Sequence, residues 1–432
     1  MRIFKRQLTA AEVQALAKSN PLSPILAVAA DKRTKEQVQT LRDYYLKNDD
    51  AKYGELVKQR DKLKAEEAEL KKPLTTVMVM GNMSKLRDTF ILNRGAYDSP
   101  TAHKVEPGTP RVLPPMLKDA PRNRLGMAEW LFQPNHPLTA RVAVNRYWQL
   151  LFGQGLVTTP EDLGSQGEFP SHPELLDWLV IDFRENGWNV KQIVMSATYR
   201  QTSNIRPELL KRDPDNRLLA RGPRFRLQGE FIRDNALAIS GPLNTKMGGP
   251  GVKPYQPPGL WIEVGLSGKP KFVQDHAGKL YRRRIYTYWK RSAPPPSMQL
   301  FDAPTREKCA VRRPRTNTPL QALVTLNDVQ FVEAARNLAQ RMIKGGGRGP
   351  EDRSAFAFLL AVARKPSESE QQVVLEVYNT GLEHYRNDEK AAKQLLGIGE
   401  SKRDEALDPA EHAAWTLVAG MLLNLNETLT RE

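Results

Sequence analysis

The chain has 432 residues, 40% hydrophobic and 26% charged, a composition that supports two or three hydrophobic cores and is ordinary for globular proteins. Its 65 Lys and Arg against 49 Asp and Glu give a net charge of +16, which favours polyanionic partners such as nucleic acid, anionic lipid headgroups, or acidic and sulfated polysaccharides. A single cysteine excludes an internal disulfide and a CxxCH haem site, and we expect no membrane span or signal peptide in these residues.

The beginning of the chain is predicted to hold an isolated strand and then charged helices. Residues 2–12 have the pattern of a strand followed by a short helix, in which Thr9 is the cap and Glu12 occupies the capping-box position. Because a strand needs a partner, we expect the chain to start inside a longer architecture. Residues 21–74 are predicted to form a charged helical hairpin or linker. Leucines seven residues apart suit a helical hairpin or a short coiled-coil seam there: Leu56, Leu63 and Leu70.

A small β component is expected next. Two apolar runs, 75–80 and 88–95, flank a Gly-Asn turn signal and predict a hairpin. Residues 98–123 are rich in proline and predict an extended connector. Alternation at 282–291 predicts a further strand.

The rest of the chain is predicted to be helical. Capping signals stand before two of the helices, Ser171 with Pro173 and Thr318 with Pro319, and Gly241 ends another. Three or four helices are expected in the last eighty residues, the final one apolar on one side. The helices expected before them cover residues 124–133, 138–153, 171–186, 225–241 and 318–343. The predicted fold is mainly α with a small β component: a multi-helix globular domain with a short N-terminal helical hairpin.

The segment from 281 to 315 is the most unusual part of the sequence. It contains ten Lys and Arg against Asp302 and Glu307, a net charge of +8 within the total of +16. Aromatic residues alternate with its first basic residues, as on nucleic-acid surfaces, but arginine pairs bind carboxylate or sulfate equally well. We therefore predict an anion-binding cleft to which Arg283, Arg312 and Arg313 contribute, with Asp302 orienting them.

Two helical segments are candidates for the facing wall. Helical spacing would place Arg226, Glu230 and Asp234 on one face, either lining a polar pocket or forming a buried ion-pair network. Asn145 and Arg146 stand close to Trp148, a combination that suits a sugar ring or a base.

Nucleophilic and metal chemistry have weaker support. Cys309 is flanked by Lys308, Arg312 and Arg313, whose charges favour a thiolate, although a lone cysteine is more often a small apolar filler. His172 is the best placed histidine, but a structural role at a helix start explains it more simply. We expect no metal site, because no histidine pairs with a second ligand at a zinc-enzyme spacing.

Several blocks of the sequence resemble a known family. The chain is similar to the planctomycete-type domain of unknown function that occurs with planctomycete cytochrome c-like domains in large exported proteins, over about residues 75–432. The blocks that carry this resemblance lie at 92–100, 138–179, 196–203, 216–234, 254–261 and 301–328. Residues 1–17 are similar to the last strand of a concanavalin-like, laminin-G-type domain. These resemblances imply three parts: a remnant of that domain at 1–20, the hairpin or linker at 21–74, and the family domain at 75–432 with a helical C-terminal subdomain at 346–432.

The family resemblance also implies a setting for function. It implies a periplasmic or extracellular protein whose haem c lies in an upstream cytochrome c-like domain, with no cofactor in this chain. We expect an extracytoplasmic module that binds or helps to process anionic polysaccharide, and we do not expect nucleic acid as a partner. The alternatives are a structural scaffold that docks the cytochrome domain, or a hydrolase that uses Cys309 or His172.

Overall fold

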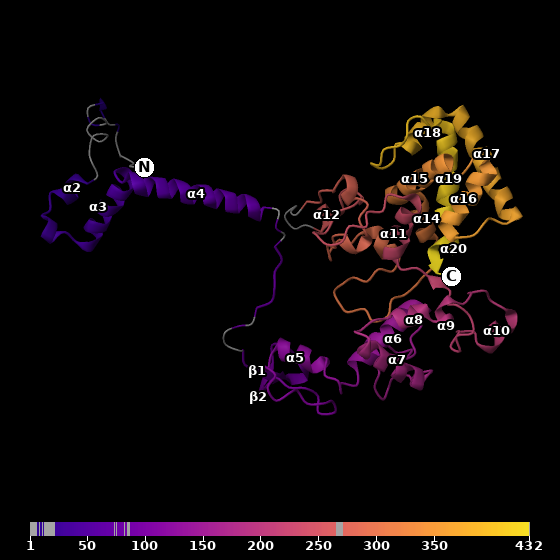
Figure 1. Ribbon diagram of the computed structural model, residues 1–432, viewed down its shortest axis with the longest axis horizontal. Coiled ribbons are helices and arrows are strands. Elements are labelled where there is room, and N and C mark those ends of the chain that lie inside the picture. The colour runs from indigo at the N-terminus through magenta and orange to yellow at the C-terminus, as the bar shows by residue number, and fades with distance from the viewer. Residues whose placement is uncertain are drawn as a thin grey trace. The chain divides into compact units, whose positions relative to one another are not determined.

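The computed structural model describes residues 7, 9, 10, 12, 22–72, 74, 76–81, 83, 87–264 and 271–431. The chain divides into two units, Met1–Ser84 and Lys85–Glu432. In the described residues helices dominate and the strands form two small antiparallel pairs, which confirms the predicted fold class (Figure 1). The strand expected at the start of the chain lies outside the described residues.

The first unit is helical in its described part. Thr34 caps α3 through a capping box, since its hydroxyl accepts from the backbone N–H of Gln37 while Gln37 Oε1 accepts from the N–H of Thr34. The helices are α2 (Ser23–Leu26), α3 (Lys35–Asn48) and α4 (Ala51–Lys71).

In the first unit the expected capping bonds are present, whereas the leucines at heptad spacing are exposed. Thr9 and Glu12 form the expected reciprocal bonds, with Thr9 N–H donating to Glu12 Oε2 at 2.9 Å and Glu12 N–H to Thr9 Oγ1 at 3.4 Å. The leucines at heptad spacing on α4 are 55%, 64% and 74% exposed: Leu56, Leu63 and Leu70.

The second unit holds the remaining helices. The first group is α5 (Arg124–Leu131), α6 (Thr139–Phe152), α7 (Pro173–Glu185), α8 (Lys191–Met195), α9 (Ala197–Arg200), α10 (Pro207–Arg212), α11 (Gly229–Ser240), α12 (Leu260–Glu263) and α13 (Pro296–Leu300). The second group is α14 (Pro319–Asn327), α15 (Val329–Gly345), α16 (Pro350–Val362), α17 (Glu368–Asn387), α18 (Glu389–Leu396), α19 (Pro409–Leu423) and α20 (Asn426–Leu429).

The hairpin near the start of this unit differs from the expected one. β1 (Thr89–Leu92) pairs antiparallel with β2 (Pro100–Val105), and the turn between them contains Arg94 with φ 49°. The described part of the first apolar run, 76–80, is not in a strand. The prediction of a 75–80 partner was therefore wrong, because the tight turn after Leu92 lets the nearer segment pair first.

A smaller core forms around α6 and α7. The buried side chains of α6 recur every four residues, which puts them on one face of the helix: Ala140, Val144, Trp148 and Phe152. Trp148 stacks on Phe152 with ring centroids 4.2 Å apart. This packing explains Trp148 as a core residue and turns the opposite face of α6 outward.

The start of α7 corrects one capping prediction. The N-cap residue is His172 instead of Ser171, and its side chain makes no cap bond. Pro173 begins the helix as expected.

The larger core surrounds α19, which lies between α15 and α17 (Figure 1). Ten of its fifteen residues are buried and they are distributed around the helix, with Leu417 exposed; Trp415 is fully buried and stacks on Tyr378 of α17 at 4.3 Å. The expectation of a helix apolar on one side was therefore wrong, since a helix that is apolar all round belongs in the centre of a bundle. This core extends from Ile232 to Leu429, so α11 packs with the C-terminal helices.

The helix predicted at 318–343 is two helices. α14 ends at Asn327, and Asp328 begins α15 by accepting the backbone N–H of Gln330 through its side chain. An aspartate cap inside an amphipathic run breaks the helix although the apolar spacing continues. Thr318 is the N-cap residue of α14 but its side chain makes no cap bond.

Residues 282–291 do not form the predicted strand. A 3-10 turn spans Arg284–Tyr286, and the segment contributes only the isolated bridges Asn244↔Arg282 and Val252↔Thr287. The alternation of side chains there reflects burial of individual arginines and does not produce a ladder of strand pairs.

A short sheet joins the end of the chain to the region between the two cores. β3 (Phe225–Arg226) pairs antiparallel with β4 (Thr430–Arg431). Arg431 donates to the carbonyl of Leu151 at the end of α6, and its guanidinium lies 4.2 Å from the ring centroid of Tyr199. The C-terminal strand therefore ties α11 and the larger core to the smaller core.

Candidate functional site

An open cleft of about 770 Å³ lies between α6 and the segment before α14. We call it the Arg cleft, because four of its described lining residues are arginines and none is acidic. It is lined by Ala143, Arg146, Tyr147, Gln149, Leu150, Gly153, Gln154, Gly155, Thr158, Gln228, Ala310, Val311, Arg312, Arg313 and Arg315.

The first wall of the cleft is the outward face of α6. Burial of the opposite face presents Arg146, Tyr147 and Leu150 to solvent, and all three are exposed. Asn145 has the opposite orientation: it is 1% exposed, accepts from Val157 N–H at 2.9 Å and donates to Val157 O at 3.0 Å. Asn145, predicted as a binding residue, therefore holds the loop after α6 in place.

The second wall is the arginine loop, residues 302–316 between α13 and α14. Asp302 closes this loop at its base, with φ 58° and a carboxylate that accepts from Thr316 N–H at 2.7 Å and Thr316 Oγ1 at 2.8 Å. Asp302 thus fixes the backbone that carries the arginines, whereas Arg312 and Arg313 bond to Glu161, Glu230 and Gln228.

Two arginines of the loop are paired. Arg313 Nη1 donates to Glu230 at 2.9 Å and 3.0 Å and to Gln228 Oε1 at 3.0 Å. Arg312 Nη2 lies 2.6 Å from Glu161 Oε1, and both side chains of that pair are more than half exposed. Arg313 is consequently anchored to the first turn of α11, while Arg312 is held weakly at the rim.

The other two arginines of the cleft have no carboxylate partner among the described residues. Arg146 is exposed on α6. Arg315 lies over the ring of Phe225 at 4.1 Å, and burial lowers the pKa of its guanidinium. Arg146 and Arg315 line the same cleft from its two walls.

The predicted facing wall of Arg226, Glu230 and Asp234 does not exist as one face. α11 begins at Gly229, so Arg226 lies on β3 and the helical spacing used to group it with Glu230 does not apply. Asp234 accepts from the backbone N–H of Arg284 at 2.8 Å and 3.0 Å, and burial raises the pKa of its carboxyl. Of the three, Glu230 alone contacts a cleft arginine.

The first half of the basic segment is structural. Arg233 and Arg284 are buried on either side of Gln330 Oε1, at 2.6 Å and 3.3 Å. Arg282 donates to the carbonyls of residues 246, 248 and 250 and stacks on Tyr286. Arg283 is half-buried and donates to Met247 Sδ at 3.2 Å, and it does not line the Arg cleft. Sequence reasoning therefore grouped residues that the fold separates.

The two nucleophile candidates lie outside the cleft. Cys309 is exposed and His172 Nδ1 contacts Ser171 Oγ at 3.0 Å, and neither lines the Arg cleft. In the described ranges, no group of three His, Cys, Asp or Glu residues is arranged to hold a metal ion.

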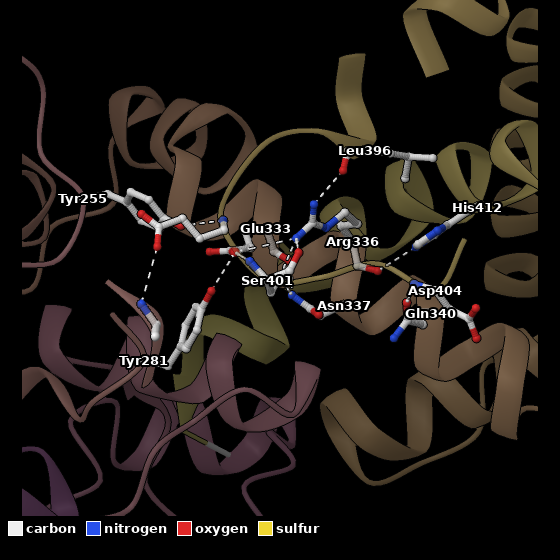
Figure 2. Close-up of polar contacts among 12 residues, drawn as sticks. Tyr255, Tyr281, Glu333, Arg336, Asn337, Gln340, Leu396, Ser401, Asp404 and His412 are labelled. Atoms are coloured by element: carbon white, nitrogen blue, oxygen red, sulfur yellow. Dashed lines mark hydrogen bonds and ion pairs between the residues drawn. The ribbon is translucent and has the colours of Figure 1, made fainter. Parts of the chain in front are cut away.

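A second polar cluster was missed by sequence reasoning (Figure 2). Glu333 of α15 is 1% exposed and accepts from Tyr281 Oη at 2.9 Å and from Ser401 N–H at 2.5 Å, with Arg336 3.6 Å away. Burial raises the pKa of the Tyr281 hydroxyl, and the nearby charge of Glu333 adds to this. The sequence signal for this cluster was the pair Glu333 and Arg336, three residues apart on an otherwise apolar face of a helix.

The Arg336 side of this cluster ties down the loop before α19. Arg336 is 3% exposed and donates to Leu396 O at 2.6 Å and to Ser401 O at 2.5 Å, and its own carbonyl contacts His412 Nε2 at 3.0 Å (Figure 2). Burial lowers the pKa of His412. The cluster therefore joins α15, α19 and the 396–404 loop.

Comparison with protein families identifies the domain. The model of PSD1, a protein family of unknown function (DUF1553), matches residues 123–378. The chain belongs to this family. The matched range contains both walls of the Arg cleft and is narrower than the 75–432 predicted from the sequence blocks. No curated protein and no solved structure matches the chain.

Proposed function

We propose that this PSD1-family domain is an anion-binding module that holds an anionic polysaccharide in the Arg cleft. The observation that supports this most is the placement of Arg146 and Arg315 on the two walls of one cleft, where neither has a carboxylate partner among the described residues. Guanidinium groups form two parallel hydrogen bonds to carboxylate or sulfate, and a cleft without acidic lining residues does not repel such groups.

The rest of the lining suits a sugar chain. Tyr147 and Leu150 are 42% and 41% exposed and offer apolar surface to the faces of sugar rings. Glutamines at three positions and the hydroxyl of Thr158 can exchange hydrogen bonds with sugar hydroxyls: Gln149, Gln154 and Gln228. A volume of about 770 Å³ leaves room for more than a single anionic group.

Nucleic acid is a poorer match. The aromatic and basic residues at 282–291 gave the nucleic-acid signal, but Arg282 is stacked on Tyr286 and Trp289 is covered by Arg306 at 4.4 Å. Side chains that are engaged within the fold do not form a platform for unstacked bases.

A scaffold role is the second candidate function. Buried arginines in the first half of the basic segment, residues 281–291, favour it. Arg282 and Arg284 of this half, together with Arg233 of α11, are buried and bind carbonyl and amide oxygens inside the domain. A haem c domain upstream, docking to it, and a location outside the cytoplasm are proposals supported by the resemblance of the sequence blocks. Sequencing the complete reading frame tests them, since finding neither a CxxCH motif nor a signal peptide upstream would contradict them.

The test of the main proposal compares a neutral and a sulfated form of one polysaccharide with two other polyanions. We would titrate the full chain with dextran sulfate, neutral dextran, polygalacturonate and single-stranded DNA by calorimetry at two salt concentrations. The proposal predicts binding of the sulfated or the uronate polymer that weakens with salt and no binding of neutral dextran. Absence of binding to both acidic polymers would contradict it, as would equal or tighter binding of the DNA.

A further inference from the structure

A second, much smaller cavity lies behind the Arg cleft. Its volume is about 10 Å³, about what one water molecule needs. It shares Gln228, Arg313 and Arg315 with the cleft, and other residues complete its lining. These are Arg226, Leu227, Phe301, Asp302, Pro314, Thr316 and Gln321.

One acceptor atom in this cavity wall is left over. Gln321 is 0% exposed, and its Nε2 donates to Leu300 O at 2.8 Å and to Thr316 Oγ1 at 3.0 Å. The Thr316 hydroxyl in turn donates to Asp302 at 2.8 Å, so it must accept from Gln321. Turning the amide round would place Gln321 Oε1 against the Leu300 carbonyl oxygen, which cannot donate. The network therefore fixes Oε1 as a buried acceptor without a donor in the described residues.

One donor atom in the same wall is also left over. Nε of Arg226 is buried and has no acceptor among the described residues. Arg226 is held on β3 by its pairing with Thr430, so its backbone cannot swing away without breaking the short sheet. A buried polar group without a partner destabilises the folded state, and native proteins commonly satisfy such groups with ordered water.

The chemistry of the wall selects a neutral molecule. An anion such as chloride would meet the Asp302 carboxylate and the Gln321 oxygen, and a cation would meet Arg226, Arg313 and Arg315. Water both accepts and donates, and a cavity of this size admits one molecule.

We propose that a single water molecule occupies this cavity, accepting from Arg226 Nε and donating to Gln321 Oε1. The water completes a chain of hydrogen bonds from β3 through Gln321 and Thr316 to Asp302, the residues that close the arginine loop. Gln321 and Arg226 are then positioning residues for Arg313 and Arg315. The water site does not depend on what the cleft binds.

A high-resolution crystal structure of the full chain without ligand tests the site directly. We expect one ordered water within hydrogen-bond distance of both Arg226 Nε and Gln321 Oε1. An empty cavity, or a direct bond between the two side chains, overturns the proposal. This result does not depend on whether dextran sulfate or polygalacturonate binds. The crystal structure therefore tests the water site even if the proposed function is wrong.

A double-mutant cycle tests the coupling in solution. The variants are Arg226→Met, Gln321→Met and the pair, compared by their unfolding equilibrium constants in urea. Because one water links the two side chains, we expect the cycle to show a coupling of about three- to tenfold. Additive effects within about twofold overturn the proposal. If Gln321→Met does not fold, the crystal structure of the unchanged chain decides alone.

Discussion

The Nη1 atom of Arg313 lies 2.9 Å from Oε2 and 3.0 Å from Oε1 of Glu230, so one guanidinium nitrogen contacts both carboxylate oxygens. The contact joins the arginine loop to the first turn of α11, where a negative charge is also favoured by the helix dipole. Glu230 neutralises Arg313 and fixes its loop, and under the proposed function Arg146, Arg315 and the weakly paired Arg312 remain to meet a ligand.

Replacing Glu230 separates these two effects. The variant Glu230→Gln leaves the half-buried Arg313 without its counter-charge, and we expect a loss of about 1–2 kcal/mol in the free energy of unfolding. The added positive potential should tighten binding of a sulfated glycan about two- to fivefold. Urea unfolding and calorimetry measure the two quantities. The control is Glu161→Gln, whose exposed pair with Arg312 should contribute less than about 0.5 kcal/mol. Equal losses in both variants would contradict this account.

The bonds between Asn145 and Val157 predict a large stability effect at a buried residue of α6. Asn145→Ala leaves the buried N–H and C=O of Val157 unpaired, and we expect the free energy of unfolding to fall by about 2–4 kcal/mol. Asn186→Ala is the matched control, because the bonds of Asn186 to Asp182 are exposed and water replaces them. A difference of less than about 1 kcal/mol between the two variants would show that the contact is unimportant.

Gly399 is required next to Glu333. Its φ is 87°, and a Cβ placed on it would lie 2.4 Å from Cδ of Glu333. We expect Gly399→Ala to reduce the free energy of unfolding by more than about 2 kcal/mol, because an alanine would be strained at this φ and its Cβ would clash with Glu333. Gly108→Ala, where nothing lies within 4 Å, should be close to neutral in the same urea titration. A neutral Gly399→Ala would mean that the loop at 396–404 is not held as described.

Glu370 makes stability depend on acid pH. Its two oxygens bind Arg364 at 2.7 Å and 2.8 Å, and this pair lowers the pKa of Glu370 to about 2. Because the folded pKa is lower than the unfolded one, the stabilisation is complete above the unfolded pKa and disappears as the pH falls towards 2. Glu370→Gln should therefore unfold more easily at pH 7, by about 1 kcal/mol after solvent screening, and match the unchanged chain near pH 2. Glu376→Gln on the same helix is the control, and a difference that persists unchanged at pH 2 would refute the assignment.

Local signals in the sequence predict local structure well. Thr9 and Glu12 form the expected capping bonds, and Gly241 ends α11 as expected. Both signals could be read from the sequence because a cap depends only on residues within one helical turn. The breaks at Asp328 and Gly229 were missed, since apolar spacing alone does not show where a helix starts again.

Which side chains line the cleft depends on contacts between residues that are far apart in the sequence. Arg312 and Arg313 were predicted for the cleft and line it, and Arg146 lines it too. Arg283 and Arg315 have the same side chain in the same basic segment, yet one packs by Met247 and the other faces the cleft. Their orientations follow from the closure of the loop by Asp302 and from the position of Phe225, which no spacing rule contains. Asn145 was predicted to bind a ligand because the sequence does not show that its side chain bonds to the backbone of Val157.

The central claim is that Arg146 and Arg315, which have no carboxylate partner among the described residues, bind one anionic ligand from the two walls of the cleft. The most direct measurement is the Kd for dextran sulfate of the variant Arg146→Gln with Arg315→Gln, with Arg111→Gln as an exposed arginine outside the cleft. The account predicts that the Kd rises at least about tenfold in the double variant and changes less than about twofold in the control. A double variant that binds as tightly as the unchanged chain would contradict it.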